Sequence, residues 1–192
     1  NNVLKQRGRK EITPASPFVE SVIYLALGAM AVVDMAIGEE NLPAGILALV
    51  AAAALLLRMK GWRTFFILDQ PILWVLHLGA AWLVFGLFLL GLAGLSESVT
   101  QITGIHALSI GAIGTTLIAV MSRAALGHTG RPIKAPFLIV AAYLIIGASA
   151  IARVTASLEV FDDNDVLIEA SGLLWILAFV LFSVVYGPIL MA

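Results

Sequence analysis

The stretch that decides the fold is PILWVLHLGAAWLVFGLFLLGL, which runs from Pro71 to Leu92. Its only ionisable side chain is His77; the other positions are apolar residues, glycines and a leading proline. A helix rises about 1.5 Å per residue, so about 20 apolar residues cross the roughly 30 Å hydrocarbon core of a bilayer. Proline is well tolerated in the first turn of a helix. This stretch is therefore expected to be a membrane-spanning helix.

Five further apolar stretches of similar character lie on either side of it. The sequence predicts an all-α, polytopic bundle of six transmembrane helices over residues 18–192, preceded by a basic segment over residues 1–17. The predicted spans are approximately 18–37, 42–57, 71–92, 102–121, 136–151 and 170–190. No soluble domain fits between them, because the longest connection, from Arg153 to Glu169, is short.

The composition agrees with a membrane protein and excludes several other classes. Hydrophobic residues make up 61% of the chain and charged residues 12%, and the mean hydropathy is +1.04. Soluble domains are about half apolar and a quarter charged. A net charge of −1 gives no basic field that would attract nucleic acid, so the expected partner is the lipid bilayer. The absence of cysteine excludes disulfides, thiolate metal sites and iron–sulfur clusters.

The charged residues predict how the bundle is oriented. Ten of the eleven lysines and arginines fall on one side of the six-span topology, and Arg153 alone falls on the other. The basic side carries Lys5, Arg7, Arg9, Lys10, Arg58, Lys60, Arg63, Arg123, Arg131 and Lys134. The opposite side carries Glu39, Glu40, Glu97, Glu159, Asp162, Asp163 and Asp165. By the positive-inside rule, both termini are expected to be cytoplasmic.

Two histidines fall inside predicted spans, where ionisable groups are costly and often functional. Counting at about 1.5 Å per residue, His77 lies roughly 8 Å below the cytoplasmic boundary and His106 roughly 6 Å below the external one. Their depths then differ by roughly 16 Å. The two axial ligands of one haem iron lie about 4 Å apart, because a metal–nitrogen bond is about 2 Å. His77 and His106 are therefore not expected to ligate the same iron. The alternative for each is a neutral imidazole hydrogen-bonded across a helix interface.

The fourth span is rich in glycine, alanine, serine and threonine, from Gly104 to Ser122. Small residues allow close helix approach, which places this helix in the middle of a bundle. A flat cofactor could use the same surface.

The segment HALSIGAIGTTLIAVMSRAALGHTGRPI, from His106 to Ile133, resembles the NnrS family of bacterial membrane proteins. Two further stretches agree with that family: PILWVLHLGAAWLVFGL, from Pro71, and SGLLWILAFVLFSVVYGPIL, from Ser171. The family's members have about twice as many spans, so the chain resembles their C-terminal half. The chain begins without methionine or a signal peptide, and we expect it to be a piece of a longer protein.

The resemblance implies a protein of the bacterial cytoplasmic (inner) membrane that contains haem and copper and responds to nitric oxide and nitrosative stress. It implies haem b and copper as cofactors, and His77, His106 and His128 as the matching positions that could hold metal. It also implies as partner a missing N-terminal six-helix half, or a second copy in its place.

The segment RAALGHTGRPIKAP, from Arg123 to Pro136, has two interpretations. As a simple hairpin, its glycines and prolines end one helix and start the next, and its basic residues follow the positive-inside rule. As a cofactor clamp, Arg123 and Arg131 would pair with a haem propionate through two-pronged hydrogen bonds.

Two other functions remain open at this point. The chain could be half of a twelve-span secondary transporter, or a membrane scaffold without chemistry of its own. Charges near the membrane midplane, expected at a coupling site, are scarce. No residue has an assignable role in a bond-making step, so whether the protein is an enzyme stays open.

Overall fold

The computed structural model describes residue 8, residue 14 and residues 16–38, 41–161 and 164–191. Every regular element among these residues is helical. The elements are α2 (Pro17–Ile37), α3 (Leu42–Lys60), η1 (Thr64–Phe66), α4 (Pro71–Ala93), α5 (Gln101–His106), η2 (Ala107–Gly114), α6 (Thr115–His128), α7 (Phe137–Ser157) and α8 (Asp165–Leu190). The predicted all-α class is confirmed.

Among the described residues, six helical stretches are long and apolar enough to cross a membrane, as predicted, and they correspond one to one with the expected spans. The fourth is continuous from Gln101 to His128 and comprises α5, η2 and α6. The chain is therefore a membrane protein. The basic residues of segment 1–17, together with Glu39, Glu40, Asp162 and Asp163, lie outside the described residues.

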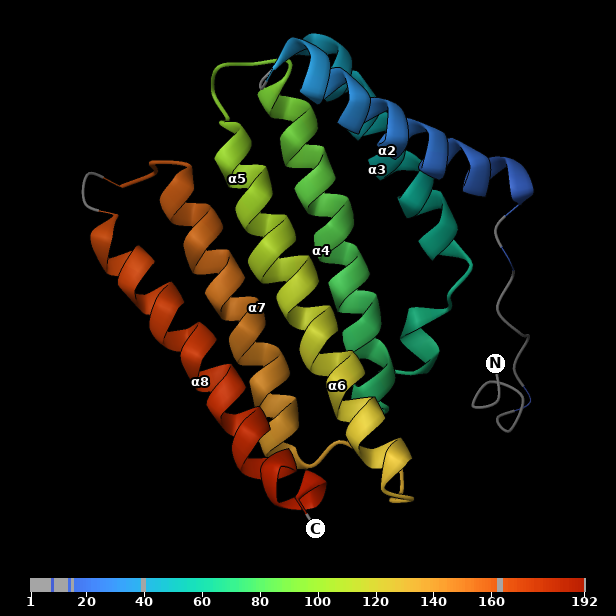
Figure 1. The fold of residues 1–192 in the computed structure, drawn as a ribbon, viewed down its shortest axis with the longest axis vertical. Helices are drawn as coiled ribbons and strands as arrows, with labels where there is room; N and C mark the ends of the chain where they lie inside the picture. The colour runs from blue at the N-terminus through green and yellow to red at the C-terminus, as the bar shows by residue number, and fades with distance from the viewer. Residues whose placement is uncertain (1–7, 9–13, 15, 39–40, 162–163, 192) are drawn as a thin grey trace.

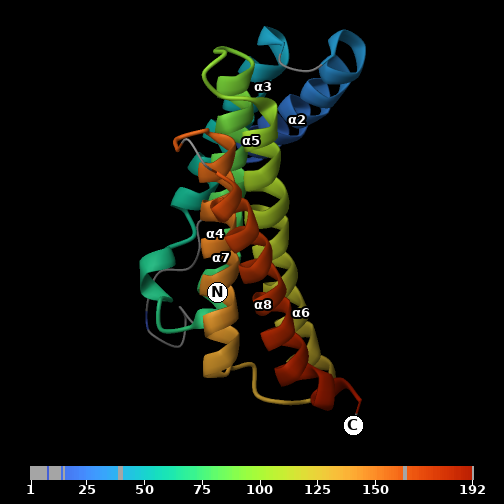
Figure 2. The same cartoon turned by 90° about the vertical axis from the view of Figure 1, so that its left-hand side faces the viewer.

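The spans pack mainly in the order of the sequence. α2 packs on α3, α3 on α4, α4 on the α5–η2–α6 helix, and α7 on both that helix and α8. Figure 1 shows this arrangement, with α8 at one edge and the α2–α3 pair at the other. In the turned view of Figure 2, α4, α6, α7 and α8 run lengthwise while α2 crosses at a steep tilt. The continuous fourth helix is central, as its small residues predicted.

The two edge helices have the smallest share of buried residues, 11% of the apolar stretch for α2 and 17% for α8. Their outward residues are large and apolar, including Leu25 (72% exposed) and Leu173 (68% exposed). An apolar surface of this kind is stable only against lipid or another apolar protein surface.

Four helices run further than the hydropathy predicted. The second span continues to Lys60, so Arg58 and Lys60 lie on α3. The fourth span reaches His128, so Arg123 and His128 lie on α6 and not in a loop. The fifth continues to Ser157, which places Arg153 on α7. The sixth begins at Asp165. Hydropathy reports the part of a helix that lipid covers, whereas backbone hydrogen bonds carry the helix on into the polar boundary.

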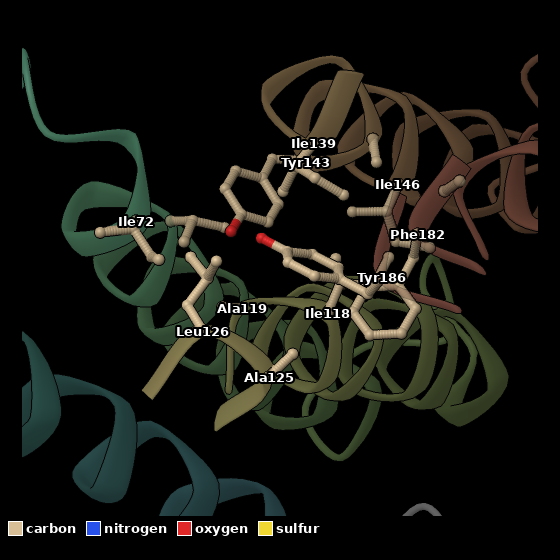
Figure 3. Close-up of a cluster of buried hydrophobic side chains, with 13 residues drawn as sticks. Ile72, Ile118, Ala119, Ala125, Leu126, Ile139, Tyr143, Ile146, Phe182 and Tyr186 are labelled. Carbon is tan, nitrogen blue, oxygen red and sulfur yellow. The ribbon is translucent and has the colours of Figure 1, made fainter. Parts of the chain in front are cut away.

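The largest apolar cluster joins α4, α6, α7 and α8. Figure 3 shows Ile118, Ile139 and Ile146 packed around two fully buried tyrosines, Tyr143 and Tyr186. The two phenol hydroxyls point toward one another, and neither makes a well-formed hydrogen bond.

Two polar or close contacts hold neighbouring spans together. Ser149 on α7 and Ser171 on α8 are buried, and each hydroxyl donates to the other's backbone carbonyl, at 2.8 and 2.9 Å. Between α3 and α4, a Cβ added to Gly94 would lie 2.7 Å from both the Asn41 carbonyl oxygen and the Gly45 Cα. Only glycine permits this helix crossing.

Candidate functional site

His106 lies where the fourth span changes its winding. It is the last residue of α5, and the next eight residues, Ala107–Gly114, form the π-helical stretch η2. π-Helical turns are rare and are frequent at functional sites. The start of α5 is tied to α7, because the buried Thr103 hydroxyl donates to the Ser157 carbonyl at 3.3 Å. The end of this helix therefore has a fixed position against α7.

Arg153 on α7 is the partner of His106. Its Nε donates to His106 Nε2 across 3.3 Å, and both side chains are half-buried. A guanidinium has only donors. His106 Nε2 must therefore present its lone pair in this geometry, which is the state in which an imidazole binds a metal. The sequence had assigned Arg153 to a connection, and the structure places it at the histidine.

A cavity of about 530 Å³ adjoins this pair at the end of the bundle predicted to be external, called the outer end below. Small-molecule and cofactor pockets occupy about 300–1,000 Å³. The lining residues come from α5 and the residue before it, from the end of α7 and the turn after it, and from α8: Thr100, Gln101, Ile102, Ile105, His106, Arg153, Ala156, Ser157, Glu159 and Ile168. Ile102, Ile105, Ala156 and Ile168 give the cavity an apolar side, and the other six lining residues are polar or charged, Glu159 among them.

His77 lies at the opposite, inner end, near the start of α4. Its Nδ1 is 2.7 Å from the Thr64 hydroxyl, and its ring lies 5.0 Å from the Trp62 ring, centroid to centroid. Both partners belong to the connection between α3 and α4. His77 and His106 are thus held at different ends of antiparallel helices, in keeping with the depth argument, and they do not share a site.

His128 is the last residue of α6 and is exposed, as are Arg123 and Arg131. The end of α6 is stabilised by its own neighbouring residues: the Thr129 hydroxyl donates to the Ala125 carbonyl at 2.7 Å, and Gly130 adopts a left-handed φ of 66°. Arg123 lies roughly 25 Å along the helix from His106, at about 1.5 Å per residue. A clamp at Arg123 and Arg131 could therefore serve only a group bound at the inner end.

The three histidines do not gather in one place. Within the described part of the chain, no three histidine or acidic side chains come close enough to hold a metal ion together. What the structure does bring together is one histidine, one arginine and a cavity.

Sequence reasoning missed two residues, Arg153 and Thr64. Arg153 carried a usable signal, because it is the only basic residue that departs from the positive-inside pattern. Thr64 carried none, since one threonine in a loop is unremarkable until the fold sets it against His77.

Comparison with known proteins assigns the chain to a family. The family model described as NnrS protein matches residues 1–192. No curated protein and no solved structure matches the chain. Because the family match covers the whole sequence, the chain belongs to the NnrS family.

Proposed function

We propose that this chain holds haem in the outer cavity through His106 and takes part in a bacterial response to nitric oxide. The observation that carries the proposal is the His106–Arg153 pair at the cavity wall. A haem site needs an imidazole lone pair, apolar walls for the porphyrin and a cation for a propionate. The outer cavity offers all three, and family membership supports the cofactor.

The residues have separable roles. His106 would ligate the iron through Nε2, the atom that now accepts from Arg153. Arg153 would then be free to pair with a propionate, since arginine forms charge-assisted, two-pronged bonds with carboxylates. Ile102, Ile105 and Ile168 would lie against the macrocycle and limit the access of water. Bound haem supplies an iron centre whose surroundings decide between ligand binding and electron transfer.

His77 and His128 are the histidines left for copper, which imidazole also suits. His77 is oriented by Thr64, and metal-bound histidines commonly have such a hydrogen-bonded second nitrogen. We place the protein in the bacterial cytoplasmic membrane, with an N-terminal six-helix half, or a second copy, as its partner.

The experiment combines metal analysis with a stress assay on the protein as it is made in its host. The purified protein is expected to contain haem and copper, and His106→Ala is expected to lose haem while keeping copper. The same variant should fail to protect cells from a nitric oxide donor. Protein that contains neither metal when isolated from stressed cells would contradict the proposal.

A further inference from the structure

The connection between α3 and α4 carries an arginine, Arg63, whose guanidinium has no acceptor among the described residues. Arg63 has a left-handed backbone (φ 53°), and its Nε is buried without a hydrogen-bond partner. Arg63 as a whole is only part-buried, and no hydrogen bond or ion pair joins its guanidinium to the residues that the structure describes. A left-handed conformation outside glycine costs of order 1–3 kcal/mol and persists only where the surroundings fix it. The surroundings therefore fix the backbone of this turn, and the part-buried guanidinium keeps donors that are unused among the described residues.

Arg58, one helical turn from the end of α3, provides the contrast. Its Nε lies 3.1 Å from the Glu20 carboxylate of α2, so its charge is balanced within the protein. Lys60 is exposed and adds positive charge beside Arg63. Asp69 is the acidic residue of the connection, and its carboxylate accepts from the neighbouring Gln70 amide at 3.3 Å. Within the described part of the chain, Arg63 has no counter-charge like the one that Glu20 gives Arg58.

The residues that follow Arg63 expose large apolar side chains. Phe65 is 86% exposed, and Phe66 and Leu68 are also exposed, whereas Ile67 between them is buried and anchors the segment to the bundle. The segment lies between α3 and α4, two helices apolar enough to span a membrane, and we expect it at the membrane boundary. Large apolar side chains there enter the acyl region, while cations beside them reach the headgroups.

We propose that Arg63 binds the phosphate of an anionic phospholipid, with Lys60 adding to the attraction and Phe65 inserted among the acyl chains. Phosphate accepts two-pronged hydrogen bonds from a guanidinium, and anionic lipids attract basic residues next to spanning helices. The bound headgroup supplies an acceptor for the terminal nitrogens of Arg63, whereas the buried Nε stays within the protein. Because Thr64 follows Arg63 and bonds His77 at 2.7 Å, the lipid also fixes the segment that orients His77.

The test measures the thermal unfolding of the detergent-purified protein as phosphatidylglycerol is added. Phosphatidylcholine and inorganic phosphate are added in parallel. Arg63→Asn removes the charge, and asparagine tolerates the left-handed backbone. Arg58→Gln is the matched control, since it removes a cation that is already paired.

Phosphatidylglycerol is expected to raise the Tm of the parent protein and of Arg58→Gln in a saturable way. Arg63→Asn should lose most of that rise, and Arg63→Lys should retain part of it. An undiminished response in Arg63→Asn would overturn the proposal, as would an equal rise with phosphatidylcholine. A full rise with inorganic phosphate alone would assign the site to soluble phosphate and overturn the lipid assignment.

Discussion

Arg153 and His106 lie 47 positions apart in the sequence, and the Nε of one donates to the Nε2 of the other across 3.3 Å. This contact fixes the imidazole at the junction between α5 and the π-helical stretch η2. It also places the one basic residue of the outer side next to the cavity. Arg153 thus donates to the same nitrogen that would bind a metal, and its guanidinium lies close enough to the cavity to pair with an anion there.

The first prediction concerns Arg153→Gln. A charge-assisted hydrogen bond contributes about 1.5–3 kcal/mol, so losing the propionate partner should weaken haem binding roughly 10-fold or more. Titration of haem into cofactor-free protein, followed by absorbance, measures the change. Arg58→Gln, with its charge paired at the other end of the bundle, should bind haem like the parent. If Arg153→Gln binds haem as tightly as the parent protein does, Arg153 is not part of the haem site.

A second prediction concerns the exchange of hydrogen bonds between Ser149 and Ser171. Hydrogen bonds between membrane helices average about 0.6 kcal/mol and reach about 1.7 kcal/mol. Ser149→Ala and Ser171→Ala should each lower the free energy of unfolding by amounts in this range. Ser183→Ala is the control, because that exposed hydroxyl bonds only to the Phe179 carbonyl of its own helix. Chemical unfolding in mixed micelles gives the values, and a loss in the control as large as in the pair would refute the assignment.

The crossing of α3 and α4 gives a third prediction. Gly94→Ala forces a methyl group against backbone atoms of Asn41 and Gly45 and should cost about 1–3 kcal/mol. Gly28→Ala meets nothing within 4 Å and should stabilise its helix by up to about 1 kcal/mol. Opposite signs in the two unfolding measurements are expected. A neutral Gly94→Ala would show that the helices are not this close.

Tyr186 provides the fourth prediction, because its ring and its hydroxyl make different contributions. The ring packs on Phe182, 5.0 Å between centroids, in the cluster of Figure 3. The hydroxyl makes no well-formed hydrogen bond. Tyr186→Phe should therefore change the free energy of unfolding by less than about 1 kcal/mol. Tyr186→Ala should cost on the order of 3–5 kcal/mol. A large loss in Tyr186→Phe would mean that the hydroxyl has a partner in solution.

The membrane fold could be predicted from the sequence because the apolar composition of each span is visible within the span itself. Pro71–Ala93 is apolar nearly throughout, and no distant contact is needed to see that it spans a bilayer. The helix ends were predicted less well. The composition of the stretch from Arg153 to Ser157 is typical of a polar loop, but the stretch continues α7. Backbone hydrogen bonds form equally well beyond the lipid, so the helix does not end where the apolar residues end.

The candidate site could be predicted only in part, for a related reason. Intramembrane histidines stand out one at a time, so His77 and His106 were identified. Their partners depend on tertiary packing: Arg153 meets His106 only when α7 lies beside α5, and Thr64 meets His77 only when η1 folds back onto α4. The π-helical winding of Ala107–Gly114 has no counterpart in the hydrophobic pattern.

The most direct test of the account is the reduced-minus-oxidised absorption spectrum of His106→Ala beside that of His77→Ala, in protein purified from its host. The haem bands are expected to vanish in His106→Ala and to persist in His77→Ala, because His106 adjoins the outer cavity and His77 does not. Full haem bands in a folded His106→Ala protein would contradict it and would place the cofactor elsewhere.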